Sequence, residues 1–226
     1  MYNPIQLSLL NSDMTINLRS KGFCMILSSP SGGGKSSLAK ALLKIDHSLK
    51  LSISCTTRLP RSGETEGTDY YFKTKQEFNE LIQQNLLLEY ADIYHNYYGT
   101  PKEPVEKALE EGLDLVFDID WQGAKSIKKH LPEVATVFIL PPSLSILKQR
   151  LENREKNKDI VDFRMSMVRT EMMKIIEYDY IVINNDFDLA LSQLYNILIA
   201  ERTKRSRLDR LDEFLSNSYG ASLSRK

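Results

Sequence analysis

The sequence predicts an α/β fold in which a mostly parallel sheet is covered by helices on both faces. From residue 21 onward, apolar strand-like runs alternate with helical patterns. The strand-like runs are continuously apolar, which is typical of strands buried on both faces. The length of 226 residues suits one large α/β domain or two small ones, and 42% hydrophobic with 27% charged residues is ordinary for a globular protein.

The predicted elements follow one another in the order that such a sheet requires. An apolar run followed by a glycine loop predicts the first strand and the first helix. Pro101 is expected to start a later helix that ends before Gly112, and Ser143 is expected to cap another helix. The predicted strands are Phe23–Ser28, Leu51–Cys55, Tyr70–Phe72, an extended segment Leu86–Tyr94, Leu113–Asp120, Ala135–Leu140 and Tyr180–Ile183. The predicted helices are Lys35–Leu43, Lys75–Asn85, Pro101–Glu111, Gln122–His130, Ser143–Asn153, Met165–Tyr178 and Leu189–Leu208.

Three segments carry no periodic pattern. Residues 1–20 mix polar and apolar types, and we expect a floppy or loosely docked arm. Residues 154–162 are almost wholly charged or polar and suggest a mobile flap. Residues 209–226 are polar, and we expect them to fray.

Charge and composition narrow the possible partners. Thirty basic residues balance thirty acidic ones, so no overall field favours nucleic acid. Cys24 and Cys55 lie in apolar runs and are interpreted as small buried hydrophobes, while the three histidines (His47, His95, His130) lack metal-ligand spacing. No run of about 18 apolar residues predicts a membrane span and no leader is recognised, so we expect a cytoplasmic protein.

The segment between the first strand and its helix is the most informative. It reads Ser28-Ser29-Pro30-Ser31-Gly32-Gly33-Gly34-Lys35-Ser36-Ser37. Consecutive glycines let backbone N–H groups turn around a phosphate chain, and the helix N-terminus adds its positive dipole end. In this pattern Lys35 would reach the β- and γ-phosphates and Ser36 would hold Mg²⁺. Ser29 replaces the usual first glycine, which suffices if its φ is negative; the alternative is a turn that merely caps a helix.

A second specific segment runs from Ser52 to Phe72. Arg58 and Arg61 lie three residues apart with Pro60 between them, so they can form a clamp on a phosphate. The alternative is a pair of solvated arginines. Polar residues also end two other strands, at Ser54 and at the Asp118/Asp120 pair, and the topology brings such strand ends to one cleft.

These motifs together resemble the guanylate kinase family. The resemblance rests on the segment 52–72, on Asn96-Tyr97-Tyr98-Gly99-Thr100, on 115–123, on Pro141-Pro142-Ser143 with three later arginines, and on 178–186, in family order over residues 21–205. It implies a P-loop NTPase-type parallel sheet with helices on both faces, a small mixed GMP-binding subdomain and a helical lid. The segment 155–163 is slightly shorter than the family's usual lid spacing.

The resemblance also implies how the chain is divided. A core is expected over 21–53, 101–150 and 165–205, a GMP-binding region over 54–100 and a lid over about 151–164, with an extension 1–20 and a tail 206–226. The implied reaction transfers the γ-phosphoryl group of ATP to GMP, with Mg²⁺ as cofactor. ATP and GMP are the expected partners, no nucleic acid or membrane is expected, and the oligomeric state stays open.

Site residues follow from the resemblance position by position. ATP is expected to contact Ser29, Pro30, Ser31, Gly32, Gly33, Gly34, Lys35, Ser36, Ser37 and Asn184. GMP is expected to contact Ser54, Arg58, Arg61, Tyr70, Glu89, Tyr98, Thr100 and Asp120. The expected catalytic residues are Lys35, Arg58, Arg150, Arg154 and Arg164, and the expected metal ligands are Ser36 and, through water, Asp118.

Several of these residues could instead have a purely structural or solvent-exposed role. Glu89 could be an exposed acid, Asp120 could cap the helix that follows it, and the three later arginines could form a solvated helix face. At the level of the whole chain the alternatives are another nucleoside-monophosphate kinase, a GTP-hydrolysing switch, for which the N-K-x-D pattern is missing, and a non-catalytic guanylate-kinase-like binding module.

Overall fold

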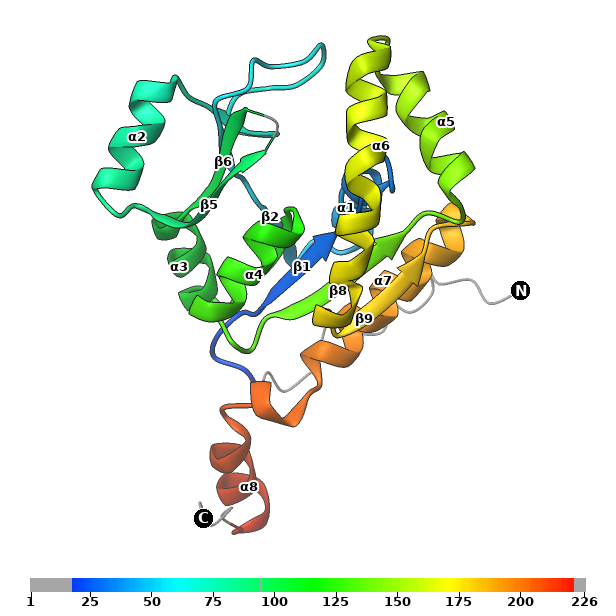
Figure 1. Cartoon of the computed structure of the whole chain (residues 1–226). Helices are drawn as coiled ribbons and strands as arrows, with labels where there is room; N and C mark the ends of the chain where they lie inside the picture. Colours follow the sequence, from blue (N-terminus) through cyan, green and yellow to red (C-terminus); the bar gives the residue numbers. More distant parts are fainter. Residues whose placement is uncertain (1–17, 94, 222–226) are drawn as a thin grey trace.

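Figure 1 shows the computed structural model of the chain, which describes residues 18–93 and 95–221. Within those residues the strands form two sheets. The larger sheet has the order β2-β7-β1-β8-β9, and all its neighbouring strands are parallel. Its strands are β1 (Cys24–Ser28), β2 (Leu49–Ser52), β7 (Asp114–Asp118), β8 (Ala135–Leu140) and β9 (Tyr180–Ile183).

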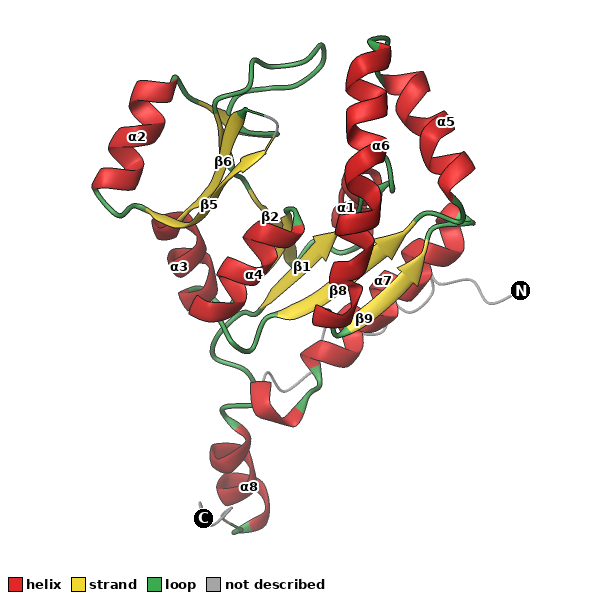
Figure 2. Ribbon diagram, viewed as in Figure 1, coloured by secondary structure: helices red, strands yellow, loops and turns green. Residues whose placement is uncertain are grey.

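Helices cover both faces of the larger sheet, which confirms the predicted fold class (Figure 2). The helices α1 (Lys35–Ile45) and α7 (Phe187–Arg202) cover one face, and α3 (Lys102–Glu110) and α4 (Trp121–His130) cover the other. Successive side chains of β1 point to opposite faces: Met25 and Leu27 pack with α1 and α7, whereas Cys24 and Ile26 pack with α3 and α4. Both faces are therefore buried, which is why this strand is apolar throughout.

The smaller sheet is mixed and has the order β4-β3-β6-β5. Its strands are β3 (Cys55–Thr56), β4 (Tyr71–Phe72), β5 (Leu87–Ile93) and β6 (Asn96–Pro101), and α2 (Lys75–Gln83) packs on it through Phe78. The predicted single strand over 51–55 is wrong, because Leu51 pairs with β7 whereas Cys55 pairs with β6. The chain passes from one sheet to the other at residues 53 and 54.

An antiparallel pair of helices rises beyond the carboxyl ends of the large sheet (Figure 1). These are α5 (Leu144–Arg154) and α6 (Lys158–Met172), followed by a 3₁₀ helix over Met173–Glu177. The predicted flap over 154–162 is wrong for 158–162, which begin α6. Asn157 caps that helix by accepting a hydrogen bond from the Asp159 N–H at 2.9 Å, and this capping overrides the polar composition.

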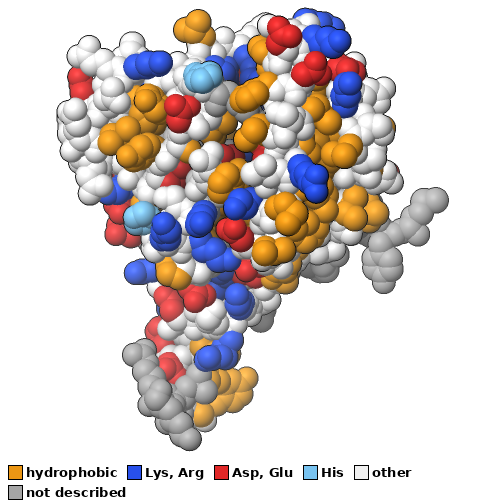
Figure 3. Space-filling view, viewed as in Figure 1, with side chains coloured by type: hydrophobic (Ala, Val, Ile, Leu, Met, Phe, Trp, Pro, Cys, Tyr) orange, Lys and Arg blue, Asp and Glu red, His pale blue; other side chains and the backbone are white. Residues whose placement is uncertain are grey.

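The helix pair α5/α6 has a core of its own. Its buried side chains are Leu147, Leu151, Val161 and Val168. Its outer surface stays partly apolar: Figure 3 shows hydrophobic side chains over α5 and α6, and Phe163 is half exposed. The pair is therefore a small packed unit attached to the edge of the larger sheet.

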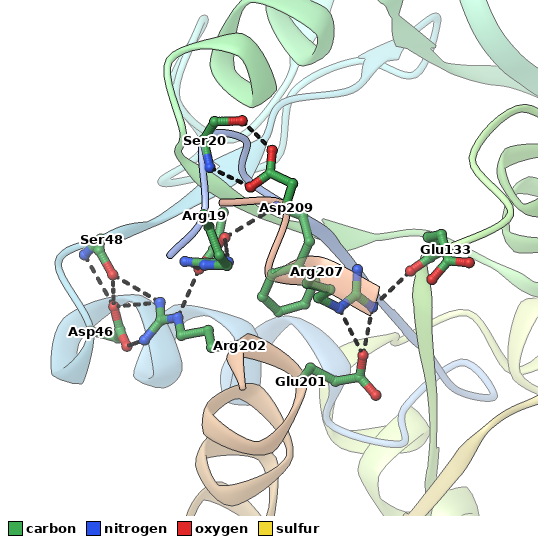
Figure 4. Close-up of polar contacts among 11 residues, drawn as sticks. Arg19, Ser20, Asp46, Ser48, Glu133, Glu201, Arg202, Arg207 and Asp209 are labelled. Atoms are coloured by element: carbon green, nitrogen blue, oxygen red, sulfur yellow. Dashed lines mark hydrogen bonds and ion pairs between the residues drawn. The ribbon is translucent and has the colours of Figure 1, made fainter. Parts of the chain in front are cut away.

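Residues near both ends of the described chain meet at the opposite edge of the sheet, where the strands begin (Figure 4). Buried Asp114 accepts hydrogen bonds from Arg19 at 2.9 Å and from Arg202 at 2.7 Å. The Arg210 N–H bonds the Leu18 carbonyl, and Asp209 accepts from Ser20.

This network corrects the predictions for both termini. The expected fraying of 209–226 is wrong for α8 (Leu211–Tyr219), which forms a helix. The expected loose arm is wrong for residues 18–20, which are bound to the tail, and residues 1–17 lie outside the described residues. The last long helix, α7, ends at Arg202, and a 3₁₀ turn over Arg205–Arg207 follows it.

The cysteines are buried, as the sequence predicts. Cys24 and Cys55 are buried free thiols, and burial raises the pKa of Cys24 to about 12 and of Cys55 to about 11. His47, His95 and His130 are exposed. None of the helices among the described residues combines the length and apolarity needed to cross a membrane.

Candidate active site

A cleft of about 630 Å³ is lined by residues that follow strands of the large sheet, by residues of the smaller sheet and by residues of the helix pair α5/α6. Figure 1 shows the smaller sheet and the helix pair on either side of the carboxyl ends of the large sheet. The cleft gathers side chains from segments far apart in the sequence. Its expected lining residues are Ser29, Pro30, Ser31, Gly32, Gly34, Lys35, Ser36, Ser37, Ser54, Arg61, Tyr70, Glu89, Tyr98, Asp118, Asp120, Arg150, Arg154, Arg164 and Asn184. Ala91, Ile93, Ile119, Glu171, Asn185 and Phe187 also line it.

The glycine loop has the backbone geometry of an anion cradle. Gly32 and Gly34 have φ of 92° and 98°, a region that favours glycine, and the Gly33 N–H bonds the Pro30 carbonyl at 2.9 Å. Gly34 caps α1 without any side-chain hydrogen bond, so the first N–H groups of α1 are left for a ligand. Among the described residues Ser29 is not one of the non-glycine positions with positive φ, so a serine fits there.

Lys35 and Asp118 face each other across the floor of the cleft. Their Nζ and Oδ1 atoms are 2.8 Å apart, and both side chains are mostly shielded from solvent. Ser36 lies one residue further along α1 and lines the same cleft. The ion pair keeps a cation at the mouth of the loop, where phosphate oxygens could replace or share its carboxylate partner.

Asn184 supports the loop from the end of β9. Its side-chain amide donates to the Gly33 carbonyl at 2.9 Å, and its own carbonyl accepts from Arg150 at 3.2 Å. A Cβ on Gly34 would lie 2.2 Å from the Asn184 Nδ2, so the amide also fills the space beneath the loop. The expected contact between Asn184 and adenine stays a prediction.

An acidic pocket lies on the side of the smaller sheet. Glu89 is only 5% exposed and accepts from the Thr100 hydroxyl at 2.7 Å, so the alternative of an exposed acid is wrong. Burial raises the pKa of Glu89 to about 7; the Thr100 hydrogen bond opposes that rise, and the nearby charge of Asp120 adds to it. Asp120 caps α4 through the Gly123 N–H at 2.9 Å and also lines the cleft, so both of its predicted roles are geometrically compatible.

The two loop arginines differ in their placement. Arg61 lines the cleft, whereas Arg58 pairs with Glu64 at 2.8 Å and lies 5.4 Å from the centre of the Tyr70 ring. The side chain of Arg58 is only 14% exposed, which contradicts the solvated alternative for this residue. Tyr70 packs edge-on to Tyr98, and both tyrosines line the cleft.

Arginines of the helix pair close the far wall. Arg150 and Arg154 come from α5 and Arg164 from α6, and all three line the cleft. Arg154 donates to the Ser31 hydroxyl at 2.9 Å. Three expected residues, Gly33, Arg58 and Thr100, do not line the cleft themselves and instead contact residues that do.

Sequence reasoning missed one acidic residue of the cleft, Glu171. It lies on α6 seven residues after Arg164, so the two side chains share a helix face. This spacing could have predicted Glu171 as a cleft residue, because residues seven apart, two helical turns, lie on the same face of a helix. The Met and Val residues around Glu171 obscured it.

The cleft carries both cations and acids. Lys35 and the three arginines of the helix pair line it together with the acids Glu89, Asp118, Asp120 and Glu171. The cations suit a polyphosphate, and buried acids suit a ligand rich in hydrogen-bond donors. The cleft can therefore hold two different anionic ligands side by side.

Comparison with known proteins gives a consistent answer. The guanylate kinase family model matches residues 21–201. A guanylate kinase of Rickettsia felis is 60% identical over 190 residues, covering 84% of this chain and 99% of its own. One of Cereibacter sphaeroides is 45% identical over 203 residues, covering 88% and 96%. A crystal structure of guanylate kinase from Anaplasma phagocytophilum has a TM-score of 0.78 at 33% identity, covering 92% of this chain and 100% of its own.

Proposed function

This chain belongs to the guanylate kinase family, and we propose that the cleft described above carries out the reaction of that family. It is an ATP-dependent nucleoside-monophosphate kinase that transfers the γ-phosphoryl group of ATP to GMP, giving ADP and GDP. The roles of individual residues given below are part of the proposal.

The glycine loop would hold the triphosphate of ATP. The N–H groups at the start of α1 donate to no side-chain cap, and Lys35 lies beside them in the same cleft. Lys35 would follow the charge that passes from donor to acceptor oxygen during transfer. Arg150, Arg154 and Arg164 would neutralise the equatorial oxygens of the moving group, since they reach the same space from the helix pair.

The pocket beside the smaller sheet would hold GMP. Its phosphate would be bound by Arg61, Tyr70 and Tyr98. Arg58 would hold Tyr70 in place, because its guanidinium packs against the Tyr70 ring. Glu89 and Asp120 would accept hydrogen bonds from guanine N1–H and N2–H₂, with Ser54 and Thr100 beside them. Adenine carries a bare acceptor at N1, so AMP would leave a buried carboxylate unpaired and would be rejected.

The proposed phosphoryl transfer requires no covalent bond between the protein and the substrates. The acceptor is a phosphate oxygen that is already ionised near neutral pH, so no general base is required. The residues act by aligning the two phosphates and by replacing water around them. The cleft walls on α5 and on the smaller sheet belong to separate packed units, which suits closure around two ligands.

The residues around Lys35 also fit a magnesium ion. The Ser36 hydroxyl and the Asp118 carboxylate are hard oxygen donors at the phosphate end of the cleft, the type that Mg²⁺ prefers. Ser36 would bind the ion directly and Asp118 through water. When bound with ATP, Mg²⁺ supplies charge neutralisation between the β- and γ-phosphates.

One observation carries the choice of acceptor: a buried acid, Glu89, lies in the same cleft as the glycine loop. The test is a coupled ADP-release assay that offers GMP, AMP, UMP and CMP in turn at equal concentration. We expect GMP to be phosphorylated fastest. Faster turnover of any other monophosphate would reject the guanine assignment.

Replacement of the loop lysine tests the phosphate site. Lys35→Ala is expected to lower kcat by at least about 100-fold, because a charge aimed at the transferred group is lost. The melting temperature should stay close to that of the parent protein, because Lys35 is outside the main cores. Full turnover in this variant would remove the loop from the mechanism.

A non-catalytic binding module is the remaining alternative. No observation favours it, because the loop lysine and the open helix terminus are both present. Such a module would bind peptide and ignore ATP, so a titration with ATP alone distinguishes the two.

A further inference from the structure

The side chain of Asn184 is engaged with the glycine loop rather than left for a base. Asn184 directly follows β9, is only 4% exposed, and its Nδ2 donates to the Gly33 carbonyl at 2.9 Å. A proton that an amide already donates to the backbone is not available to adenine. These contacts favour a role in shaping the loop over a role in reading the base of ATP.

The backbone of Asn184 is fixed from two sides. Its N–H donates to the Leu140 carbonyl at the end of β8 at 2.8 Å, and its own carbonyl accepts from the Arg150 guanidinium of α5 at 3.2 Å. The sheet and the helix pair therefore fix the point from which the amide extends. A side chain on an anchored backbone holds its partner in one position, as a supporting residue of a binding site must.

The hydrogen bond to Gly33 sets the direction of one peptide of the loop. The Gly33–Gly34 peptide is trans and planar, so its carbonyl and the N–H of Gly34 point in opposite directions. Because the carbonyl points to Asn184, the Gly34 N–H points to the other side of the peptide. Backbone N–H groups attract phosphate whereas carbonyl oxygens repel it, so the direction of this peptide matters for an anion site.

The loop needs such support because its backbone is easily deformed. Gly32, Gly33 and Gly34 are consecutive, and glycine has more accessible backbone conformations than any other residue. A Cβ on Gly34 would lie 2.2 Å from the Asn184 Nδ2, so the amide supports the loop by contact as well as by its hydrogen bond. Without the amide the peptide could rotate and turn its carbonyl toward the phosphates.

We propose that Asn184 is a positioning residue for the triphosphate. Its side-chain amide holds the Gly33–Gly34 peptide in the direction that suits an anion, so it acts on the phosphates of ATP through the loop instead of contacting adenine. The inference rests on the proposed assignment of the loop to ATP. It implies that Asn184 affects any ligand that places phosphates in the loop, whatever base the ligand carries.

The experiment compares ATP with inorganic tripolyphosphate, which carries the phosphates without a base. The Kd for ATP is measured by calorimetry without GMP, and the Kd for tripolyphosphate by its displacement of ATP. Asn184→Leu keeps the branched shape of the side chain but removes the donor, and it should raise both Kd values by the same factor, about tenfold. The Kd for GMP, measured without ATP, should change less than about twofold, because the amide bonds the glycine loop.

A smaller side chain and a control complete the set. Asn184→Ala also removes the donor and should weaken both phosphate ligands at least as much, because the contact beneath Gly34 is lost as well. It takes the place of Asn184→Leu if that variant does not fold. Asn196→Ala changes an exposed asparagine on α7, is the matched control, and should bind ATP, tripolyphosphate and GMP as the parent protein does.

Three results would overturn the proposal. One is parental ATP affinity in the Asn184→Leu variant, or in Asn184→Ala where it takes its place, which would show that the donor is not needed. Another is a loss of ATP affinity without an equal loss for tripolyphosphate, which would make Asn184 a contact of adenine. The third is an equal loss of GMP affinity, which would make it a general stabiliser.

Displacement of ATP by tripolyphosphate is measured first on the parent protein. Displacement is expected if the loop holds the phosphates of ATP. Its absence would reject the assignment of the loop itself, so that failure is seen separately from a failure of the role of Asn184.

Discussion

At the scale of single residues, burial and hydrogen bonding determine how the acidic side chains of the cleft can bind a ligand. Glu89 and Asp120 were predicted from a resemblance, and the structure gives each a physical setting: Glu89 is buried against Thr100, and Asp120 is fixed as a helix cap. A buried acid with a hydroxyl donor on one oxygen keeps the other oxygen for a ligand. This setting has a consequence for pH.

The pKa of Glu89, about 7 in the ligand-free protein, predicts pH-dependent GMP binding. Guanine donors favour the ionised carboxylate, so GMP binding releases a proton from Glu89 wherever that residue is still protonated. The Kd for GMP should therefore fall as pH rises from about 6 to about 8, with most of the change near the pKa. Calorimetry over this range measures it.

Glu89→Gln is the control for this pH dependence. The amide does not titrate, so the part of the pH dependence that comes from Glu89 should be lost, while the ionisation of the GMP phosphate, with a pKa of about 6, should still contribute. The variant should also bind GMP at least about tenfold more weakly at pH 8, because its amide N–H₂ competes with guanine donors. A pH profile identical to that of the parent would assign the dependence to another group.

At the scale of elements, the glycine loop depends on a backbone that side chains cannot adopt. Gly34 has φ of 98°, and a Cβ there would meet the Asn184 amide at 2.2 Å. Gly34→Ala is expected to lower the free energy of unfolding by about 2 kcal/mol, from backbone strain and crowding together. It should also weaken ATP binding more than about tenfold, because the amide that supports the loop must move.

Gly220→Ala is the matched control for this prediction. Gly220 also has positive φ, 63°, but a Cβ there would meet nothing within 4 Å. It lies at the end of α8, remote from the cleft, so only the backbone cost should appear and ATP should bind normally. Thermal unfolding and ATP titration of both variants make the comparison. Normal ATP binding by Gly34→Ala would contradict the tight fit beneath the loop.

The helix pair shows how local capping can override composition. Residues 154–162 are almost wholly charged or polar, yet Asn157 caps a helix that starts at Lys158, and Val161 packs in the small core. A mobile flap was the expectation from polarity alone. The segment is instead the first part of helix α6, which carries Arg164 and Glu171 to the cleft.

At the scale of the whole molecule, function and stability use opposite edges of the large sheet. The cleft lies where the strands end, and the charged network of Figure 4 lies where they begin. In that network Asp114 is 2% exposed and is held by Arg19, Arg202 and the Phe23 N–H. The network fastens both ends of the described chain to the sheet, at a distance from the chemistry.

This separation predicts a variant that loses stability but keeps activity. Asp114→Ala removes a buried carboxylate that Arg19 and Arg202 both contact, and it is expected to cost about 3 kcal/mol of unfolding free energy. Below its melting temperature the variant should turn over ATP and GMP at the parental rate. Denaturant unfolding and the coupled assay measure the two effects.

An exposed ion pair provides the comparison for Asp114. Lys148 and Glu152 lie 3.9 Å apart on α5, and each side chain is at least half exposed. Glu152→Ala should therefore cost less than about 0.5 kcal/mol. Equal losses in the two variants would show that burial does not strengthen the terminal network. A large fall in turnover for Asp114→Ala would show that the two edges of the sheet are coupled.

The sequence by itself determined the α/β class, the glycine loop, the family and most of the side chains that meet in the cleft. These follow from local patterns: continuous apolar runs, glycines before a lysine, and motifs in a fixed order. Only the tertiary structure decided that residues 51–55 divide between two sheets and that Asp209 and Arg210, just before α8, bond to Ser20 and Leu18. Each of these depends on contacts between residues far apart in the chain, which leave no periodic signal because the partner, rather than the neighbouring sequence, supplies the favourable free energy.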